Sequence, residues 1–455
     1  MPRVRAAGLF GHGTDADPED LITAQAVTCA LDANQRELLR NRQGGHRATA
    51  RRSAAAGLGN LSGTGGVRYG RQIGPLGAVS DAVGGIMPAR RRQFMTSDHV
   101  GIGIVGSGFI ARAHAEAFAR LPRATLRAVA SRSAGSAAEF AGRWGIPAWF
   151  TDFRELADRP DVDVVCIAAP NALHRDIAVA AAQAGKHVIC EKPLARTLRE
   201  ADEMISACAA AGVLLMYAEE ICFAPKYVRA KELADEGALG EVYLVRQTEQ
   251  HYGPHSDWFW DPEQSGGGVL MDMGCHGIEF ARWVLGKPAA RTVAAEVGTF
   301  VHGGRTRAED HAIVTIRFDG NRMGLVEASW AKPGGMDDRA EIVGSRGITY
   351  ADLMRGSSLS TYSDVGYGYA VEKAPDTRGW TFTIFDELWH SGIPQEMDHF
   401  VSCVLDAAMP QETGADGRAV LELIYAAYRA ARVGRVELPL ELSEQEAAQP
   451  PFALW

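Results

Sequence analysis

The sequence predicts an α/β protein in which a parallel sheet covered by helices is followed by a second domain with longer strands. Three observations lead to this prediction. From Val100 to about residue 218, short apolar runs alternate strictly with stretches of helical spacing, as in consecutive βαβ units. After about Glu219, long strand-like runs follow one another with few helices between them. The chain of 455 residues is also longer than one hydrophobic core usually organises.

In the first domain, the apolar runs predict strands at 100–106, 125–131, 162–170, 186–193 and 213–220, and helical spacing predicts helices at 109–121, 134–145, 173–185 and 198–212. The second domain has strand-like patterns at 240–253, 290–302, 310–331 and 338–353, and helical patterns at 394–407 and 416–434. Within the third of these strand patterns, "FDGNR" is typical of a hairpin turn. The strand-rich part is therefore expected to form an antiparallel or mixed sheet.

We divide the chain into residues 1–97, 98–218 and 219–455. The first segment is rich in Gly, Ala and Arg, and we expect it to be a poorly ordered extension. Near its end, "RRQFM" from Arg91 to Met95 resembles a twin-arginine export signal. Such a signal needs an apolar run after it, but the run present here is the first strand of the folded domain. We therefore prefer a start codon assigned too far upstream, with a targeting segment as the alternative.

Composition limits the partners of the protein. The net charge is −9, and basic residues do not cluster beyond the N-terminal segment, which argues against a nucleic-acid partner. No apolar run reaches the roughly 18–20 residues that a membrane span requires. The seven cysteines form no Cys-x-x-Cys pair, so we expect reduced, mostly buried thiols. These features favour a cytoplasmic protein with a small-molecule partner, without a membrane or nucleic-acid partner.

A glycine-rich turn joins the first predicted strand to the first predicted helix. Gly106, Gly108 and Ala111 form Gly-x-Gly-x-x-Ala, in which the first glycine permits the tight turn and the second lets a pyrophosphate approach the backbone. The small third residue lets the helix pack closely on the strand. Phe109 and Ile110 open a helix whose N–H groups would face the phosphates. The motif indicates dinucleotide binding, and a tight turn without a ligand is the alternative.

The end of the second predicted strand bears on the choice of dinucleotide. A carboxylate there would bind the adenosine ribose and select NAD, but this chain has Ser131 and Arg132. A guanidinium at this place can face a 2′-phosphate. We therefore expect NAD or NADP as cofactor, with a preference for NADP. In the alternative interpretation, Arg132 stacks on the adenine and NAD is still accepted.

Two further motifs supply candidate catalytic residues. Glu191, Lys192 and Pro193 form "EKP" at the end of the fourth predicted strand, and ligands bind at the carboxyl ends of parallel strands. In "GGGVLMDMGCH", Asp272 and His276 are four residues apart, which on a helix places both on one face. A histidine with a carboxylate neighbour is a plausible proton acceptor near neutral pH. The alternative for this pair is an ordinary helix-surface contact.

The stretches "MYAEEICFAP" and "HYGPHSDWFWD" interleave aromatic and polar residues, which suits stacking on a sugar ring and bonding to its hydroxyls. We expect Glu219, His251 and Trp258 to contact substrate. Alternatively, Trp258 and Trp260 pack in the core or in a dimer interface. A metal site built from Glu220 and the two histidines of the second stretch has no recognised ligand spacing, so no metal is predicted.

The order Gly-x-Gly-x-x-Ala, "APNALH", "EKP" and "GGGVLMDMGCH", followed by a long-stranded domain, resembles the glucose–fructose oxidoreductase / inositol dehydrogenase / rhizopine catabolism (Gfo/Idh/MocA) family of NAD(P)-dependent sugar and polyol oxidoreductases. The resemblance covers about residues 100–440. It implies an N-terminal Rossmann domain with a doubly wound parallel sheet and a C-terminal α/β domain with an open, largely antiparallel sheet. That sheet often forms the oligomer interface, so we expect a homo-oligomer, a dimer or tetramer.

The resemblance also implies roles for single residues. It places beside the cofactor Pro170, Asn171, His174, Glu191 and Lys192. His276 would be the general base, Asp272 would bind the substrate hydroxyl or orient His276, and Lys192 would bridge the hydroxyl and the nicotinamide ribose. One departure is the pair Glu219 and Glu220, where many family members have Asn, Arg or similar polar residues.

The sequence therefore predicts an NAD(P)-dependent oxidoreductase that acts on a secondary hydroxyl of a cyclic sugar, glycoside or inositol. One alternative is a redox-neutral glycoside-cleaving enzyme that keeps NAD tightly bound. Another is a non-enzymatic dinucleotide-binding regulator. The presence of Lys192, Asp272 and His276 argues against the last, because a protein that only binds has no chemical need for all three.

Overall fold

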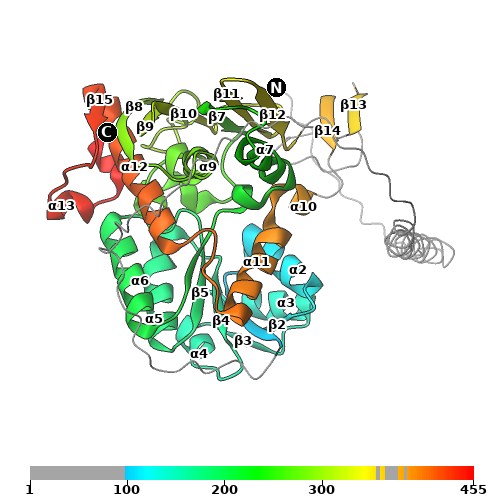
Figure 1. Cartoon of the computed structure of the whole chain (residues 1–455). Coiled ribbons are helices and arrows are strands. Elements are labelled where there is room, and N and C mark those ends of the chain that lie inside the picture. Colours follow the sequence, from blue (N-terminus) through cyan, green and yellow to red (C-terminus); the bar gives the residue numbers. More distant parts are fainter. Residues whose placement is uncertain (1–97, 355–358, 364–377, 384–386) are drawn as a thin grey trace, which may run out of the picture. The chain divides into compact units, whose positions relative to one another are not determined.

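The computed structural model describes residues 98–354, 359–363, 378–383 and 387–455. The N-terminal extension expected at 1–97, with its twin-arginine stretch, lies outside these ranges. Within them, Figure 1 shows two main sheets with helices packed on them. A separate two-stranded hairpin consists of β13 (Leu359–Ser363) and β14 (Gly379–Thr383).

Six parallel strands of the described chain form the first sheet, in the order β3-β2-β1-β4-β5-β6. Their bounds are β1 Val100–Val105, β2 Ala124–Ala130, β3 Ala148–Phe150, β4 Val164–Ile167, β5 His187–Glu191 and β6 Leu215–Ala218. This doubly wound order confirms the predicted Rossmann sheet, whose ligands bind where the strand order reverses between β1 and β4. The strand that sequence reasoning missed is β3, which has three residues and lies at the edge of the sheet.

The helices that cover this sheet are α2 Phe109–Arg120, α3 Ala134–Trp144, α4 Phe153–Ala157, α5 His174–Gln183 and α6 Leu198–Ala211, with the 3₁₀ turn η1 at Asn171–Leu173. Local signals fix their ends. At α6, the Thr197 side chain accepts a hydrogen bond from the Glu200 N–H, and Gly212 closes the helix at φ 70°. In the same way, the Ser133 side chain caps the start of α3 and Gly145 closes its end.

The second sheet has the order β12-β11-β7-β10-β9-β8-β15. Its strands are β7 Val242–Gln250, β8 Ala290–Gly298, β9 His311–Phe318, β10 Arg322–Ser329, β11 Asp337–Gly344, β12 Ile348–Asp352 and β15 Arg435–Glu437. All neighbours pair antiparallel except β7 and β10, so the expected open, largely antiparallel sheet is confirmed. The predicted hairpin turn joins β9 to β10, with Gly320 and Asn321 both at positive φ.

The remaining described elements are η2 Glu220–Phe223, α7 Pro225–Asp235, η3 Asp257–Trp260, α8 Pro262–Ser265, the π-helical turn η4 Leu270–Gly274, α9 Cys275–Val284, α10 Glu387–Ser391, α11 Ile393–Asp406, α12 Gly414–Val433, α13 Glu444–Ala447 and η5 Pro451–Leu454. Every residue of α9 is buried, and this helix packs on β7 and β10. Helix α12 packs on α6 and β6 as well as on β8 and α9. The C-terminal helices therefore contact elements of both predicted domains.

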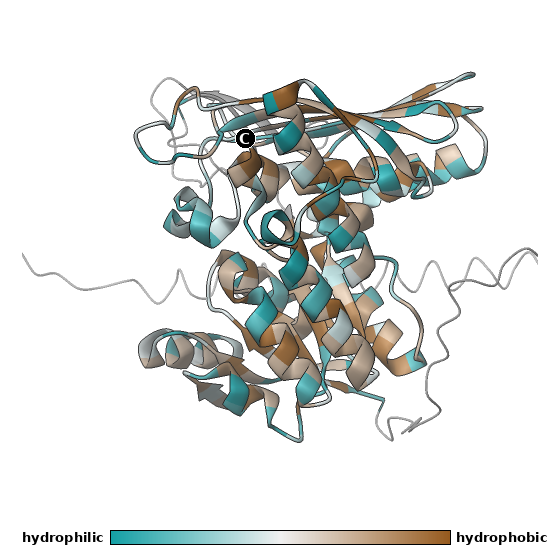
Figure 2. Ribbon diagram, turned by 90° about the vertical axis from the view of Figure 1, so that its left-hand side faces the viewer, coloured by the Kyte–Doolittle hydropathy of each residue, from teal (hydrophilic) through white to brown (hydrophobic). Residues whose placement is uncertain are grey.

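Side-chain burial follows the predicted patterns. Along β9, buried residues alternate with more exposed ones, and Figure 2 shows apolar and polar residues mixed along the strands of the second sheet.

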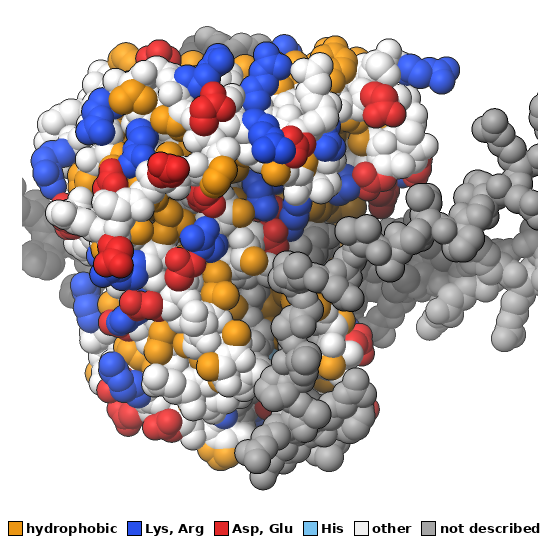
Figure 3. All heavy atoms as spheres, turned by 60° about the vertical axis from the view of Figure 1, so that its left-hand side comes forward, with side chains coloured by type: hydrophobic (Ala, Val, Ile, Leu, Met, Phe, Trp, Pro, Cys, Tyr) orange, Lys and Arg blue, Asp and Glu red, His pale blue; other side chains and the backbone are white. Residues whose placement is uncertain are grey.

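The described cysteines are buried and free, namely Cys166, Cys190, Cys208, Cys222, Cys275 and Cys403. In the described part of the chain, no helix is long and apolar enough to cross a membrane. The face drawn in Figure 3 intersperses acidic and basic side chains.

Candidate active site

The turn between β1 and α2 has the geometry of a phosphate cradle. Gly106 has a φ of 129°, and a Cβ built there would lie 2.1 Å from the Ala168 carbonyl oxygen. A Cβ on Gly108 would meet no protein atom within 4 Å, so the space above the second glycine is clear of protein. No side chain caps α2, which starts at Phe109 and has no acidic residue in its first turn. The turn therefore fits a dinucleotide pyrophosphate on the free N–H groups of α2.

The residues after β2 lie beside this turn. The Ser131 hydroxyl oxygen is 2.8 Å from that of Ser107, within the glycine motif, so the ends of β1 and β2 are joined by a hydrogen bond. Arg132 is exposed and Ser133 is the N-cap of α3. The three residues that follow β2 thus carry one guanidinium and no carboxylate.

Pro170, Asn171 and His174 follow β4. Pro170 precedes the turn η1, and the Asn171 amide donates a 2.8 Å hydrogen bond to the Ser265 carbonyl. The fully buried His174 ring lies 2.9 Å from the Ala169 carbonyl and 3.1 Å from the Pro193 carbonyl. Burial lowers the pKa of His174. His174 therefore holds together the loops that follow β4 and β5, whereas Asn171 joins the β4 loop to the end of α8.

Glu191 and Lys192 lie at the carboxyl end of β5. One Glu191 oxygen is 2.8 Å from Nε2 of the buried His114, and the other accepts the Lys192 backbone N–H at 3.1 Å. Burial opposes the charge on Glu191, but the His114 contact dominates and lowers the pKa of this carboxyl. Glu191 is thus a buried anion that fixes the backbone from which Lys192 projects.

The Lys192 ammonium reaches across to the second domain. Its Nζ donates a 2.9 Å hydrogen bond to the Asp272 carbonyl and lies 3.4 Å from Asp272 Oδ1. The other carboxylate oxygen of Asp272 accepts a 3.0 Å hydrogen bond from Trp330 Nε1. Although burial disfavours both charges, each partner stabilises the other, so the pKa of Lys192 is raised and that of Asp272 is lowered. The two groups form a buried ion pair.

His276 pairs with a different carboxylate from the one expected. Its Nδ1 is hydrogen-bonded to a Glu219 oxygen, while its Nε2 lies 3.8 Å from Glu220 Oε1. Glu219 is fully buried and also accepts the Tyr217 hydroxyl at 3.1 Å. The expectation that Asp272 orients His276 is therefore corrected, because Asp272 binds Lys192 and Trp330. Glu219, expected to contact substrate, instead holds the Nδ1 side of the histidine ring.

The reason for this difference is local. Asp272 belongs to the π-helical turn η4, and His276 belongs to the α-helix that follows it. A π turn interrupts regular α-helical spacing and is often found at functional sites. The two side chains consequently bind separate partners, whereas a regular helix would place them on one face.

Burial sets the protonation of the Glu219–His276 pair. It lowers the pKa of His276 to about 4, with the nearby Lys192 charge acting in the same direction. It raises the pKa of Glu219 to about 8, although Lys192 and Tyr217 partly oppose this shift. The imidazole is therefore neutral near pH 7. Because Nδ1 is bound to Glu219, Nε2 becomes the ring nitrogen that can accept a substrate proton once the Glu219 carboxyl is ionised.

Two further carboxylates lie at the site, of which Glu220 was noted in the sequence and Glu249 was not. Oε2 of Glu220 and Oε2 of Glu249 are buried without a hydrogen-bond partner. Glu249 is 5% exposed. Burial, followed by the nearby Asp338 carboxylate, raises its pKa well above the usual value, although Lys192 opposes this shift. Gln247 and Glu249 on β7 and His251 directly after it stand at every second position and are all buried. Polar residues at every second position of a predicted strand are the sequence signal that would have pointed to this face.

The loop after β7 brings aromatic residues to the site. His255 stacks on Phe109, the first residue of α2, with 4.5 Å between ring centroids. His251 is buried, and its charge acts on Asp272 together with that of His255. Trp258 stacks on Phe259 at 3.7 Å, whereas Trp260 lines a pocket with residues of the same loop. Of the two tryptophans, Trp260 lines the pocket, and contact of Trp258 with substrate stays a prediction.

Two clusters of described residues have metal-ligand types close together. In the first, Glu219, Cys275 and His276, the carboxylate and imidazole bind each other, and burial raises the pKa of the Cys275 thiol. In the second, Glu279, Glu412 and Asp416, the Lys287 ammonium lies 3.0 Å from Glu412 and 2.8 Å from Asp416. In both clusters, side chains with metal-ligand atoms are therefore already bound to other groups of the protein.

A Rossmann sheet with a clear phosphate cradle, facing a Lys–Asp pair and a neutral histidine, defines an NAD-binding oxidoreductase. Residues 100–219 match the oxidoreductase family with an NAD-binding Rossmann fold, and residues 227–350 match the GFO/IDH/MocA C-terminal domain. The chain belongs to the Gfo/Idh/MocA family, which confirms the resemblance inferred from its motifs.

Its relatives include sugar and polyol dehydrogenases. Over 327 residues, the chain is 28% identical to myo-inositol 2-dehydrogenase of Thermotoga maritima, covering 72% of this chain and 94% of the relative. It is 34% identical over 263 residues to levoglucosan dehydrogenase of Pseudarthrobacter phenanthrenivorans, covering 51% and 67%. Among solved structures, GenD2 from gentamicin A biosynthesis in complex with NAD is 35% identical, with a TM-score of 0.71 and coverage of 77% and 99%.

Proposed function

We propose that this protein is an NAD(P)-dependent dehydrogenase that oxidises a secondary hydroxyl of a cyclic sugar, glycoside or inositol to the ketone. The observation that carries the proposal is the juxtaposition of Lys192 and Asp272, at 2.9–3.4 Å, with the neutral His276 held by Glu219. Relatives named as inositol and levoglucosan dehydrogenases support the substrate class.

The chemistry divides between the cofactor and the protein. The bound dinucleotide supplies the hydride acceptor. His276 Nε2 takes the hydroxyl proton, while Glu219 keeps the ring in place through Nδ1. Lys192 remains charged because its pKa is raised, so it cannot serve as the base. Its ammonium instead donates a hydrogen bond to the substrate oxygen and stabilises the negative charge that develops there. Asp272 holds Lys192 in position.

The choice between NAD and NADP depends on the residues that follow β2. The exposed Arg132 guanidinium suits a 2′-phosphate, and no carboxylate follows β2 to repel it. This favours NADP. Support for NAD comes from neighbours solved with NAD and with NADH. We propose that the cradle binds either dinucleotide and that Arg132 adds affinity for NADP.

Self-association through the second sheet is part of the proposal. Several large apolar side chains on its strands are exposed, including Tyr243, Ile313, Ile348 and Tyr350. Apolar groups gathered on one sheet are typical of an interaction surface. A homo-oligomer would cover them. A cytoplasmic location also stays a prediction.

The test is a screen of polyols, monosaccharides and glycosides with NAD and with NADP, following the absorbance of the reduced cofactor. The expected result is reduced cofactor formed in proportion to one class of ring substrate, and its loss in the Lys192→Ala variant. Turnover of a glycoside with no net reduced cofactor would contradict the proposal and indicate the redox-neutral reaction.

A further inference from the structure

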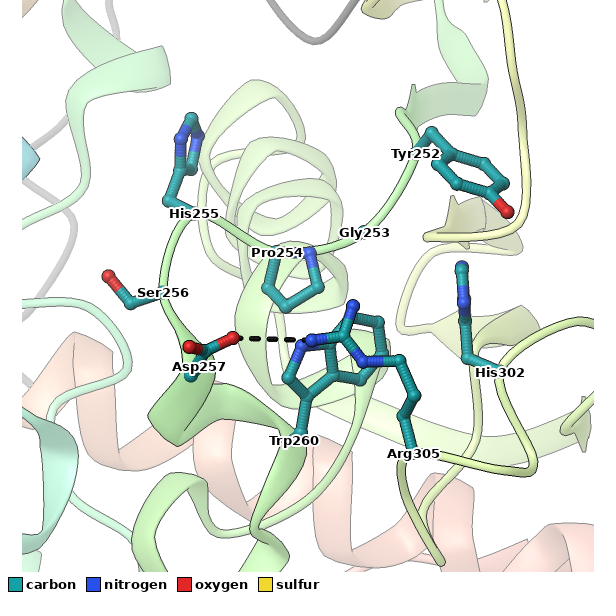
Figure 4. A pocket seen from close by; sticks show the side chains of 9 residues that line it. All are labelled: Tyr252, Gly253, Pro254, His255, Ser256, Asp257, Trp260, His302 and Arg305. Carbon is teal, nitrogen blue, oxygen red and sulfur yellow. Dashed lines mark hydrogen bonds and ion pairs between the residues drawn. The ribbon is translucent and has the colours of Figure 1, made fainter. Parts of the chain in front are cut away.

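We propose that a pocket beside the active site binds a second sugar ring, so that the preferred substrate is a two-ring glycoside with its oxidised ring at His276. The pocket lies between the loop after β7 and the loop after β8 (Figure 4). This inference rests on the proposed function, because it extends the same substrate site by one ring.

The size of the pocket suits one ring. Its volume is about 380 Å³, at the lower end of the range of roughly 300–1,000 Å³ for small-molecule sites, and it is open to solvent on one side. Residues 252–257 line one side, Trp260 forms part of the wall, and His302 and Arg305 come from the other loop. In Figure 4 the Arg305 guanidinium lies over Trp260 and is bonded to Asp257, with Tyr252 and His302 on the opposite side of the view.

The lining has the two kinds of surface that a sugar ring needs. The His302 ring is 4.9 Å from those of both Tyr252 and Trp260, and Tyr252 is 47% exposed, which leaves part of it free to pack on a ligand. The Arg305 guanidinium lies 4.3 Å from the Trp260 ring centroid and donates a 3.2 Å hydrogen bond to Asp257. Aromatic rings pack on the C–H faces of a sugar, while carboxylate and guanidinium groups bond its hydroxyls.

The pocket is connected to the reacting groups by direct contacts. Trp260 packs edge-on against Trp330 with 5.4 Å between ring centroids. Trp330 in turn donates a hydrogen bond to Asp272, the partner of Lys192. On another side, the pocket residue His255 stacks on Phe109 at the phosphate cradle. Trp260 and the fully buried Trp330 therefore lie between the pocket and Asp272 on this side, and a two-ring substrate would extend past them from His276 into the pocket.

Hydrogen bonds within the protein fix the part of the pocket wall that His302 forms. The Asp310 carboxylate accepts 2.7 Å hydrogen bonds from the backbone N–H groups of Phe300, Val301 and His302. The His302 Nε2 lies 3.0 Å from the Trp330 carbonyl, which also accepts the Gly253 N–H. Both loops are thus fixed to the backbone of Trp330, which directly follows β10. A preorganised wall lowers the entropy that binding would cost.

The test compares single-ring with two-ring substrates. Steady-state kcat and KM are measured with D-glucose, myo-inositol and levoglucosan, and with maltose and cellobiose, for the intact protein and for Tyr252→Ala and Arg305→Ala. Met409→Ala is the control, because Met409 is 67% exposed between α11 and α12 and lies outside the pocket. We expect lower KM for a two-ring substrate in the intact protein. Each pocket variant should raise that KM about five- to tenfold, with single-ring KM and kcat unchanged.

Two outcomes would overturn the subsite. One is equal kcat/KM for single-ring and two-ring substrates, and the other is a pocket variant that changes both KM values by the same factor. If no sugar is oxidised at all, the proposed function fails instead. The subsite is then decided by calorimetric titration of maltose and cellobiose into the NAD-loaded protein. Binding that weakens in Tyr252→Ala but not in Met409→Ala supports it, and no such difference refutes it.

Discussion

Replacing Glu219 by Gln should remove the main pH dependence of sugar oxidation. Glu219 has a pKa of about 8 because it is buried, and its carboxyl is hydrogen-bonded to His276 Nδ1. Below that pH, the protonated carboxyl donates to Nδ1, so the ring proton resides on Nε2 and blocks the base. Above it, the carboxylate accepts from Nδ1–H, and Nε2 is free to take the substrate proton.

The size of the effect follows from the titration. At about pH 6, two units below the Glu219 pKa of about 8, roughly one molecule in a hundred holds the active form, so kcat/KM should be about a hundredfold below its plateau. It should rise about tenfold per pH unit and level off above pH 8. Gln keeps the size of the side chain but cannot titrate. In Glu219→Gln the rate should therefore be nearly constant from pH 6 to 9, at a level about ten- to a hundredfold below the plateau.

The assay is the initial rate of cofactor reduction with limiting substrate, measured from pH 6 to 9 for both proteins at matched cofactor saturation. Circular dichroism of Glu219→Gln provides the control for folding. A rate that is flat with pH in the intact protein would refute the reasoning. So would the same rise near pH 8 in the Glu219→Gln variant, because the titrating group would then lie elsewhere.

Three other predictions follow from the sequence and the site. Arg132→Ala should weaken NADP binding more than NAD binding, because the charge-assisted bond is to the 2′-phosphate, and equal losses in binding titrations would exclude that role. Removing residues 1–94 should leave folding and activity intact, because the first described strand begins at Val100, and an insoluble or inactive product would show otherwise. Glu309→Ala should lower the free energy of unfolding by about 2–4 kcal/mol in urea titrations, because a fully buried carboxylate that bonds the Leu270 N–H and the Tyr428 hydroxyl is lost, and an unchanged midpoint would contradict this.

Much of the fold could be predicted because its signals are local. Alternation of apolar runs and helical spacing gave the parallel sheet, and the Gly106 turn gave the cradle, since a positive φ beside a close carbonyl requires glycine. Lys192 and Asp272 were chosen from motifs 80 residues apart, and the structure brings them into contact. The strand β3 was missed because a three-residue edge strand carries no periodicity that a sequence pattern can reveal.

The partners within the site could not be predicted in the same way. The bond between Glu219 and His276 joins the end of β6 to α9, and no spacing in the sequence encodes such a tertiary contact. The π turn that separates Asp272 from His276 also has no signal of its own in the residue pattern. Glu249 is buried although it is a charged residue on a strand, because the second sheet turns that face of β7 towards α9. The surroundings of these side chains depend on the tertiary packing of the two sheets, which a local sequence pattern does not describe.

The most direct test of the central claim is the kcat of Lys192→Ala, His276→Ala and the double variant at saturating substrate and cofactor. A deuterium isotope effect on the oxidised carbon should first establish that hydride transfer limits the rate. We expect each single variant to lower kcat by roughly two to four orders of magnitude, with the double variant far less impaired than the product of the two, because both residues serve one proton transfer. Cofactor affinity should change little in His276→Ala, since His276 lies outside the phosphate cradle. A near-normal kcat for His276→Ala would contradict the account.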